Sequence, residues 1–114
     1  MLIETLAAAE TLAAEGIEAE VIDVATLKPL DTVTILNSVA KTGRCVIVHE
    51  AALTAGFGAE IAARLAGEGL MSLLAPIERV TGWDTIMPLP RLEKAYMPSM
   101  ARVLAACRRV LEYR

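Results

Sequence analysis

A chain of 114 residues with 55% hydrophobic and 22% charged side chains has the length and composition of one globular domain, which we place over residues 1–114. Its net charge of −3, without a block of like charges, argues against nucleic acid or an anionic membrane surface as a partner. No run approaches the roughly 20 apolar residues that span a bilayer. Cys45 and Cys107 lack a second Cys or His at ligand spacing, which favours inert, reduced thiols in a cytoplasmic protein.

The first part of the chain predicts helix, strand and helix. Apolar residues recur at helical spacing over residues 2–15. Residues 19–24 are β-branched and partly alternating, which predicts a strand, and residues 26–30 predict a connector. Asp31 is a suitable N-cap for the next helix, and Gly43 is a suitable end.

The second part continues the alternation. Residues 44–49 are nearly all apolar, as expected of a strand that is covered on both faces. A third helix follows the next glycine-containing turn, and residues 75–81 predict a third strand. Residues 82–97 contain several prolines and predict an irregular segment with about one turn of helix. Residues 100–111 carry a clean apolar stripe and predict the last helix.

Helices that alternate with strands indicate right-handed crossovers and a parallel sheet. We therefore predict an α/β fold, a three-layer α/β/α sandwich with a mainly parallel sheet.

His49 and Glu50 close the predicted strand at 44–49, at the sheet edge where ligands of open α/β sheets bind. A functional His–Glu pair would suit this place. However, no Ser, Cys or second acid lies nearby in the sequence to complete a nucleophilic set. We favour a strand-end polar pair that shapes an interface, and we expect no catalytic, cofactor-binding or metal-binding residue.

Two further segments contain candidate residues. Gly56, Phe57 and Gly58 precede a helix and could present backbone N–H groups to an anion, but a tight strand-to-helix turn explains the glycines more simply. Trp83 is either an interface anchor or a core residue, and Asp84 suits a backbone cap or turn.

Eight short sequence strings, taken together in their order and spacing, resemble a domain of a known family. That domain is the C-terminal domain of the beta subunit of thiamine-diphosphate-dependent 2-oxo-acid dehydrogenases, of the pyruvate and branched-chain type in the transketolase superfamily. The residues HEA at 49–51 look closer to those of branched-chain and many bacterial enzymes than to those of other subgroups of the family. The strings are AEVID at 19–23, LKPLD at 27–31, KTGR at 41–44, IVHEA at 47–51, GFGAEI at 56–61, API at 75–77, RVTGWDT at 79–85 and LE at 92–93.

The resemblance implies a role without catalysis by this chain alone. The whole enzyme decarboxylates a 2-oxo acid on thiamine diphosphate and acylates a lipoyl group. Thiamine diphosphate and magnesium are held by the alpha subunit and the preceding beta domain, so this chain is expected to bind no cofactor. The implied partners are the alpha subunit, a second beta subunit and, in some members, the peripheral binding domain of the acyltransferase core.

Two departures from the family pattern carry expectations of their own. Asp84-Thr-Ile86 replaces the usual Asp-Thr-Pro, which affects the local turn. The family domain begins with strands ahead of its first helix, one of them internal to the sheet, and this chain lacks them. We therefore expect a gap between residues 19–24 and 44–49, or their forced approach, and a homo-oligomer when the chain is isolated.

Two other functions remain open from the sequence. One is a free-standing α/β module that binds an anionic small ligand at the strand-end crevice. The other, which the residues favour least, is an independent enzyme centred on His49.

Overall fold

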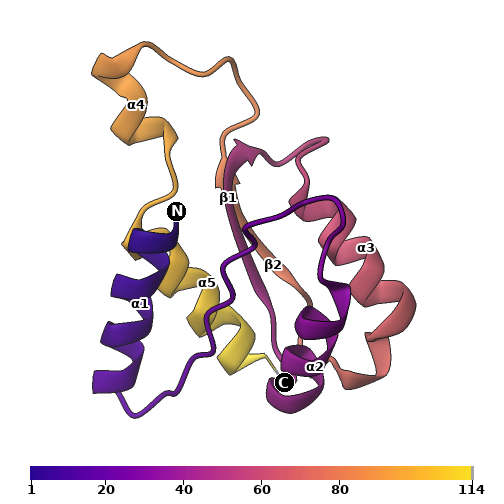
Figure 1. The fold of residues 1–114 in the computed structure, drawn as a ribbon. Coiled ribbons are helices and arrows are strands. Elements are labelled where there is room, and N and C mark those ends of the chain that lie inside the picture. Colours follow the sequence, from indigo (N-terminus) through magenta and orange to yellow (C-terminus); the bar gives the residue numbers. More distant parts are fainter. Residues whose placement is uncertain (114) are drawn as a thin grey trace.

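The computed structural model describes residues 1–113, which form helices on both sides of a small parallel sheet (Figure 1). None of the helices in this part of the chain is both long and apolar enough to cross a membrane. The elements in chain order are α1 (Leu2–Ala14), α2 (Thr32–Thr42), β1 (Val46–Ala52), α3 (Gly58–Glu68), the 3₁₀ turn η1 (Leu70–Ser72), β2 (Glu78–Gly82), α4 (Pro90–Tyr96) and α5 (Met100–Glu112).

Helix α2 begins and ends where its capping residues predict. The Asp31 carboxylate accepts the backbone N–H of Thr34 at 3.0 Å, which satisfies one of the free donors of the first turn. Gly43 ends the helix with a φ of +72°, a left-handed conformation that costs glycine little. A Cβ at Gly43 would also lie 2.6 Å from the exposed side chain of Leu74, which would have to shift.

The sheet consists of two parallel strands in the described residues, which confirms the predicted α/β class. Val46 lies opposite Glu78 and Val48 opposite Val80, before an irregularity shifts the register. Both strands lie slightly further along the chain than the sequence predicts.

The strand predicted at residues 19–24 is wrong. Residues 17–26 have no regular secondary structure, and two of their backbone N–H groups form local bonds: Ile17 to the Leu12 carbonyl and Ala25 to the Asp23 carbonyl. A strand needs a neighbour for its ladder. Here a cavity of about 780 Å³ separates the segment from β1, so the expected gap is present and no ladder forms.

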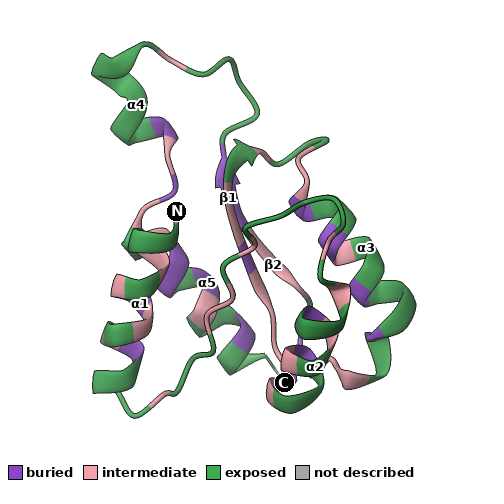
Figure 2. Ribbon diagram, viewed as in Figure 1, coloured by how far each residue is buried: buried purple, intermediate pink, exposed green. Residues whose placement is uncertain are grey.

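Two apolar clusters lie on opposite faces of the sheet, and the buried residues of the helices face it (Figure 2). One cluster joins α1 and α5 to β2, and the other joins α2 and α3 to β1, which gives the predicted α/β/α layering. The first consists of Ala8, Leu12, Val80, Val103, Leu104 and Ala106, and the second of Ile35, Val39, Ile47, Ile61 and Leu65.

The segment predicted to be irregular contains helix α4, which stands away from the main body and is mostly exposed (Figures 1 and 2). We call residues 83–97 the arm. The ring N–H of Trp83 donates to the Ala95 carbonyl at 3.0 Å, and the guanidinium of Arg102 lies 4.5 Å from the centre of the Trp83 ring. Tyr96 is buried at the base of the arm, whereas Ile86 is 90% exposed.

Candidate functional site

His49 lies on β1 against the glycines of the following turn. Neither of its ring nitrogens has a hydrogen-bond partner in the described structure. A Cβ at Gly58 would lie 2.4 Å from Nε2, and a Cβ at Gly56 would lie 2.7 Å from Cε1. Burial lowers the pKa of His49; the Ala51 backbone partly offsets this effect and the positive charge of Arg79 adds to it. The ring is therefore neutral near pH 7.

Glu50 does not act together with His49. Successive strand residues point to opposite faces, and Glu50 instead forms an ion pair with the N-terminal amino group of Met1 at 3.3 Å. This carboxylate is largely exposed, so the pair contributes little to stability. The geometry contains no His–Glu dyad, and a neutral ring beside a paired carboxylate offers no positive charge to an anion.

Asp84 binds the loop after β1 through a contact that sequence reasoning missed. Its carboxylate accepts the Thr54 hydroxyl at 2.6 Å and the Thr54 backbone N–H at 2.9 Å. These bonds hold the pKa of Asp84 below its usual range, with smaller contributions from Leu53 and Arg79. Asp84 does cap a backbone N–H group, as the sequence predicts, but this group belongs to Thr54, 30 residues earlier in the chain. No local sequence pattern indicates Thr54 as the partner.

The turn containing Gly56, Phe57 and Gly58 leads directly into α3. The N–H of Ala59 bonds to the Gly56 carbonyl at 2.9 Å, and that of Glu60 bonds to the Phe57 carbonyl at 3.0 Å. Phe57 packs against the α2–α3 cluster. The two glycines make room for the His49 ring, which explains them without an anion.

Trp83 is half-exposed and lies in the arm, where its ring N–H donates to the Ala95 carbonyl. In the described residues it forms no hydrogen bond with His49 or Glu50. Among residues 1–113, no group of three or more His, Cys, Asp or Glu side chains could hold a metal ion. Burial raises the pKa of the Cys45 thiol to about 11 and also raises the pKa of the Cys107 thiol, which favours the protonated form of both near pH 7.

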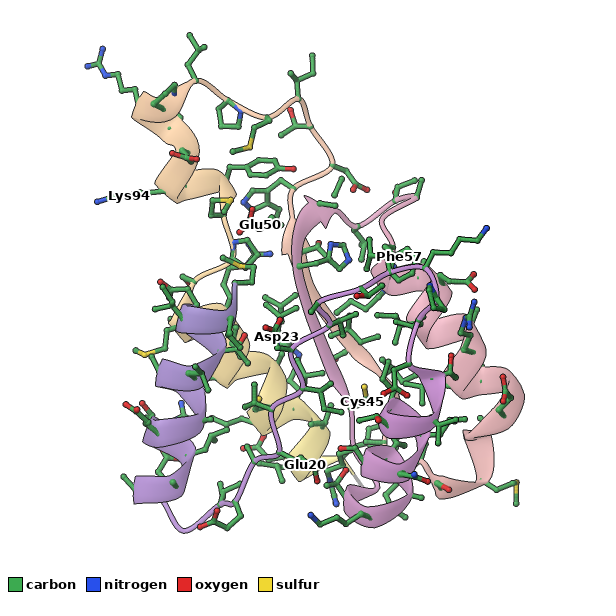
Figure 3. The ribbon with its side chains drawn as sticks, viewed as in Figure 1. Glu20, Asp23, Cys45, Glu50, Phe57 and Lys94 are labelled. Carbon is green, nitrogen blue, oxygen red and sulfur yellow. The ribbon has the colours of Figure 1, made fainter. Side chains whose placement is uncertain are left out.

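A cavity of about 780 Å³ lies beside β1. We call it the central groove: the cavity between residues 17–24 and β1. Helices α1 and α5 line one side of it, and α2 and α3 line the other. In Figure 3, Glu20 and Asp23 follow one another along the 17–24 segment, while Cys45 lies just before the start of β1 and Glu50 lies near its other end. Sequence reasoning anticipated the gap, but not that His49 would line it.

Comparisons with known proteins cover nearly the whole chain. A family model described as the C-terminal domain of transketolase matches residues 1–103. The beta subunit of 2-oxoisovalerate dehydrogenase from Pseudomonas aeruginosa is 55% identical over 98 residues, which are 85% of this chain and 27% of that protein. The beta subunit of the pyruvate dehydrogenase E1 component is 43% identical in Staphylococcus epidermidis, over 99% of this chain and 35% of that protein.

The Bacillus subtilis beta subunit of the same component is 42% identical, again over 99% of this chain and 35% of its own length. Among solved structures, a split-gene transketolase described as an inactive beta4 tetramer superposes with a TM-score of 0.81 at 31% identity. That superposition covers 99% of this chain and 36% of the other. The chain thus spans about a third of the length of the relatives that it matches.

Proposed function

We propose a function from the premise that this chain belongs to the transketolase C-terminal domain family, with beta subunits of pyruvate and 2-oxoisovalerate dehydrogenases among its relatives. It serves as the assembly domain of the decarboxylating component of a 2-oxo-acid dehydrogenase. In this role it supports association with the alpha subunit and a second beta subunit. It works in the reducing cytoplasm, where Cys45 and Cys107 remain thiols.

The observation that carries the proposal is the extent of the match. At 42–55% identity, the similarity runs through 85–99% of this chain. It therefore includes surface as well as core positions. Several matched proteins are named as subunits, and an assembly role for the matched third is consistent with those names.

Exposed apolar surface supports the same role. The arm presents Ile86 at 90%, Leu89 at 83% and Leu92 at 62% exposure. Contiguous exposed apolar groups on a globular domain mark interaction sites. We assign the arm to the subunit interface, and a docked acyltransferase domain is a further partner that the same measurement can test.

Thiamine diphosphate, which the family resemblance implies for the whole enzyme, does not fit the crevice of this chain. Its magnesium ion prefers several oxygen ligands. Asp84 is engaged by Thr54, Glu50 by the N-terminal amino group, and the His49 ring is neutral. We therefore derive no step through the cofactor, and we propose that the chain alone catalyses no decarboxylation.

Association is the test. The purified chain is mixed with the alpha subunit and the thiamine-binding part of a beta subunit, and the mass is followed by light scattering after size exclusion. A stoichiometric complex at about 10 μM is expected, weakened by Leu89→Asp on the arm and unchanged by Met71→Asp, which is 95% exposed outside the arm. Absence of a complex with the wild-type chain would contradict the proposal, as would a heat of thiamine diphosphate binding to the chain alone.

A further inference from the structure

We propose that the loop between β1 and α3 is a lid over the His49 ring, and that the arm holds this lid closed through Asp84. The lid consists of residues 53–57, which form turns without helix or strand. It lies at the carboxyl end of the two parallel strands, where the arm also begins (Figure 1). In Figure 3, Phe57 marks the end of the lid at α3. The coupling lies within the chain, so it does not depend on the proposed function.

The lid covers the nitrogens of the imidazole. Both ring nitrogens of His49 are buried and have no hydrogen-bond partner in the described residues. Gly56 of the lid lies against the ring, because a Cβ there would come 2.7 Å from Cε1. A buried polar group without a partner is unfavourable, since it has lost its hydrogen bonds to water. Opening the lid would return water to both nitrogens, so the ring itself favours the open state.

The backbone of the lid also favours opening. Ala55, at its centre, has a φ of +58°, a left-handed conformation that the Cβ of alanine makes unfavourable. Such a conformation persists where the surrounding structure holds it in place. Contacts from outside the lid must therefore keep it closed.

The contacts that hold the lid come from β2 and from the arm. Arg79 of β2 donates its Nη1 to the Leu53 carbonyl at 3.1 Å. The Asp84 carboxylate accepts the Thr54 hydroxyl at 2.6 Å and the Thr54 backbone N–H at 2.9 Å. Hydrogen bonds to ionised groups are shorter and stronger than those between neutral groups. Asp84 makes two of them and Arg79 one, so Asp84 is the main restraint on the lid.

The position of Asp84 depends on the root of the arm. The neighbouring Trp83 donates its ring N–H to the Ala95 carbonyl at 3.0 Å, which ties the two ends of the arm together. The guanidinium of Arg102 on α5 lies 4.5 Å from the centre of the Trp83 ring. Displacement of the arm would break this contact and move Asp84 away from the lid. A partner that draws the arm away from the body therefore opens the lid, and one that fixes the arm keeps it closed.

The experiment uses the full chain, in which His49 is the single histidine and Trp83 the single tryptophan. Diethyl pyrocarbonate transfers an ethoxycarbonyl group to an accessible neutral imidazole nitrogen and releases ethanol and carbon dioxide. The rate of this modification near pH 7, followed by mass spectrometry, measures how often the lid is open. We expect Asp84→Ala to raise the rate by about tenfold or more, because the closed state loses both carboxylate bonds.

A matched variant separates lid opening from a general loss of stability. Asp31 also accepts a threonine hydroxyl and a backbone N–H, both from Thr34, at 2.7 and 3.0 Å. Asp31→Ala therefore removes the same kinds of bond at the start of α2, and it should leave the modification rate of His49 unchanged. Thr54→Val, which removes only the hydroxyl, should give a smaller rise than Asp84→Ala, and Thr54→Ser should react like the wild type.

A second pair of variants tests the arm. Trp83→Ala frees the root of the arm without changing a residue of the lid, so it should raise the modification rate of His49 several-fold. Ile86→Ala, at a side chain that is 90% exposed further along the arm, should not. Conversely, Thr54→Val should change the fluorescence of Trp83, because coupling between two sites is reciprocal.

Three outcomes would overturn the proposal. One is an equal rate in the wild type and Thr54→Val, and in Asp84→Ala if circular dichroism shows that this variant folds. Another is an equal rise in Asp31→Ala and Asp84→Ala, which would indicate general unfolding instead of a lid. The third is a wild-type His49 that reacts as fast as free imidazole, which would show that the loop does not cover the ring.

Discussion

At the scale of single residues, the His49 ring and the glycines of the following turn depend on each other for space. A Cβ at Gly58 would approach the ring to 2.4 Å and the Ile47 side chain to 3.2 Å. We predict that Gly58→Ala destabilises the protein by about 1–3 kcal/mol through overpacking. Gly67→Ala, in the same helix with no atom near the new Cβ, should instead stabilise it by about 0.5–1 kcal/mol.

A double-mutant cycle identifies the cause. If the His49 ring is the obstacle, Gly58→Ala should lose most of its cost in a His49→Ala background, because the space is then free. Urea unfolding of the four proteins measures the coupling. Equal costs of Gly58→Ala in both backgrounds would show that the clash lies elsewhere.

The chemical role of His49 is tested separately. If His49 is a packing or interface residue, as we propose, His49→Ala at the matching position of a complete enzyme should leave turnover within a few-fold. A general acid or base contributes about 10²–10⁴-fold. A loss of about 10³ or more with unchanged assembly would assign a catalytic role to His49.

Asp84 makes a pH-dependent contribution whose sign follows from its lowered pKa. Because the folded state favours the ionised carboxylate, the contribution is complete above the ordinary pKa of 3.8 and is lost as pH falls through the lower folded pKa. We predict that Asp84→Asn lowers the melting temperature at pH 6 and that the difference from wild type narrows below about pH 4. Glu10→Gln, on the exposed side of α1, is the control; a pH-independent difference for Asp84→Asn would contradict the assignment.

At the scale of elements, α1 depends on a narrow contact with α5. Leu12 is only 2% exposed and belongs to the cluster with Val103 and Ala106, whereas Leu6 on the same helix is 45% exposed. Leu12→Ala should cost about 2–5 kcal/mol, toward the lower end because the neighbouring groove can admit water. Leu6→Ala should cost less than about 1 kcal/mol. Chemical denaturation of both variants checks this; equal costs would mean that α1 is not anchored at Leu12.

The helices could be predicted because their signals are local. Asp31 and Gly43 act within one turn of the helix that they bound, and the apolar stripe at 100–111 needs no distant partner. The strand at 19–24 could not be decided in this way, because its propensity is local but its hydrogen bonds require a neighbour. The Asp84–Thr54 contact was hidden for the same reason.

At the scale of the whole molecule, two apolar clusters pack on opposite faces of a sheet of only two strands in the described residues. A parallel sheet normally has its internal ladders paired and both faces covered. Here the helices cover both faces while one edge of β1 lines the groove. In the described residues, the helices therefore cover both faces of the sheet, while one edge of β1 has no neighbouring strand.

This mismatch leads to a prediction about association. Backbone groups that are buried without partners cost about 1–3 kcal/mol each, a large share of the stability of a small domain. The isolated chain should lower this cost by associating through the β1 edge and the apolar groove, so we expect dimers or larger species at high micromolar concentration. Light scattering should give masses above the 12.2 kDa of one chain.

Two substitutions distinguish the groove from the arm as the surface of association. If association uses the groove, Val21→Glu in the groove wall should return the protein toward the monomer, because a charge in this wall opposes apolar contact. Association through the arm would instead decrease with Leu89→Asp, which removes one of its most exposed apolar side chains. A stable monomer at high micromolar concentration would show that the open edge alone does not drive association.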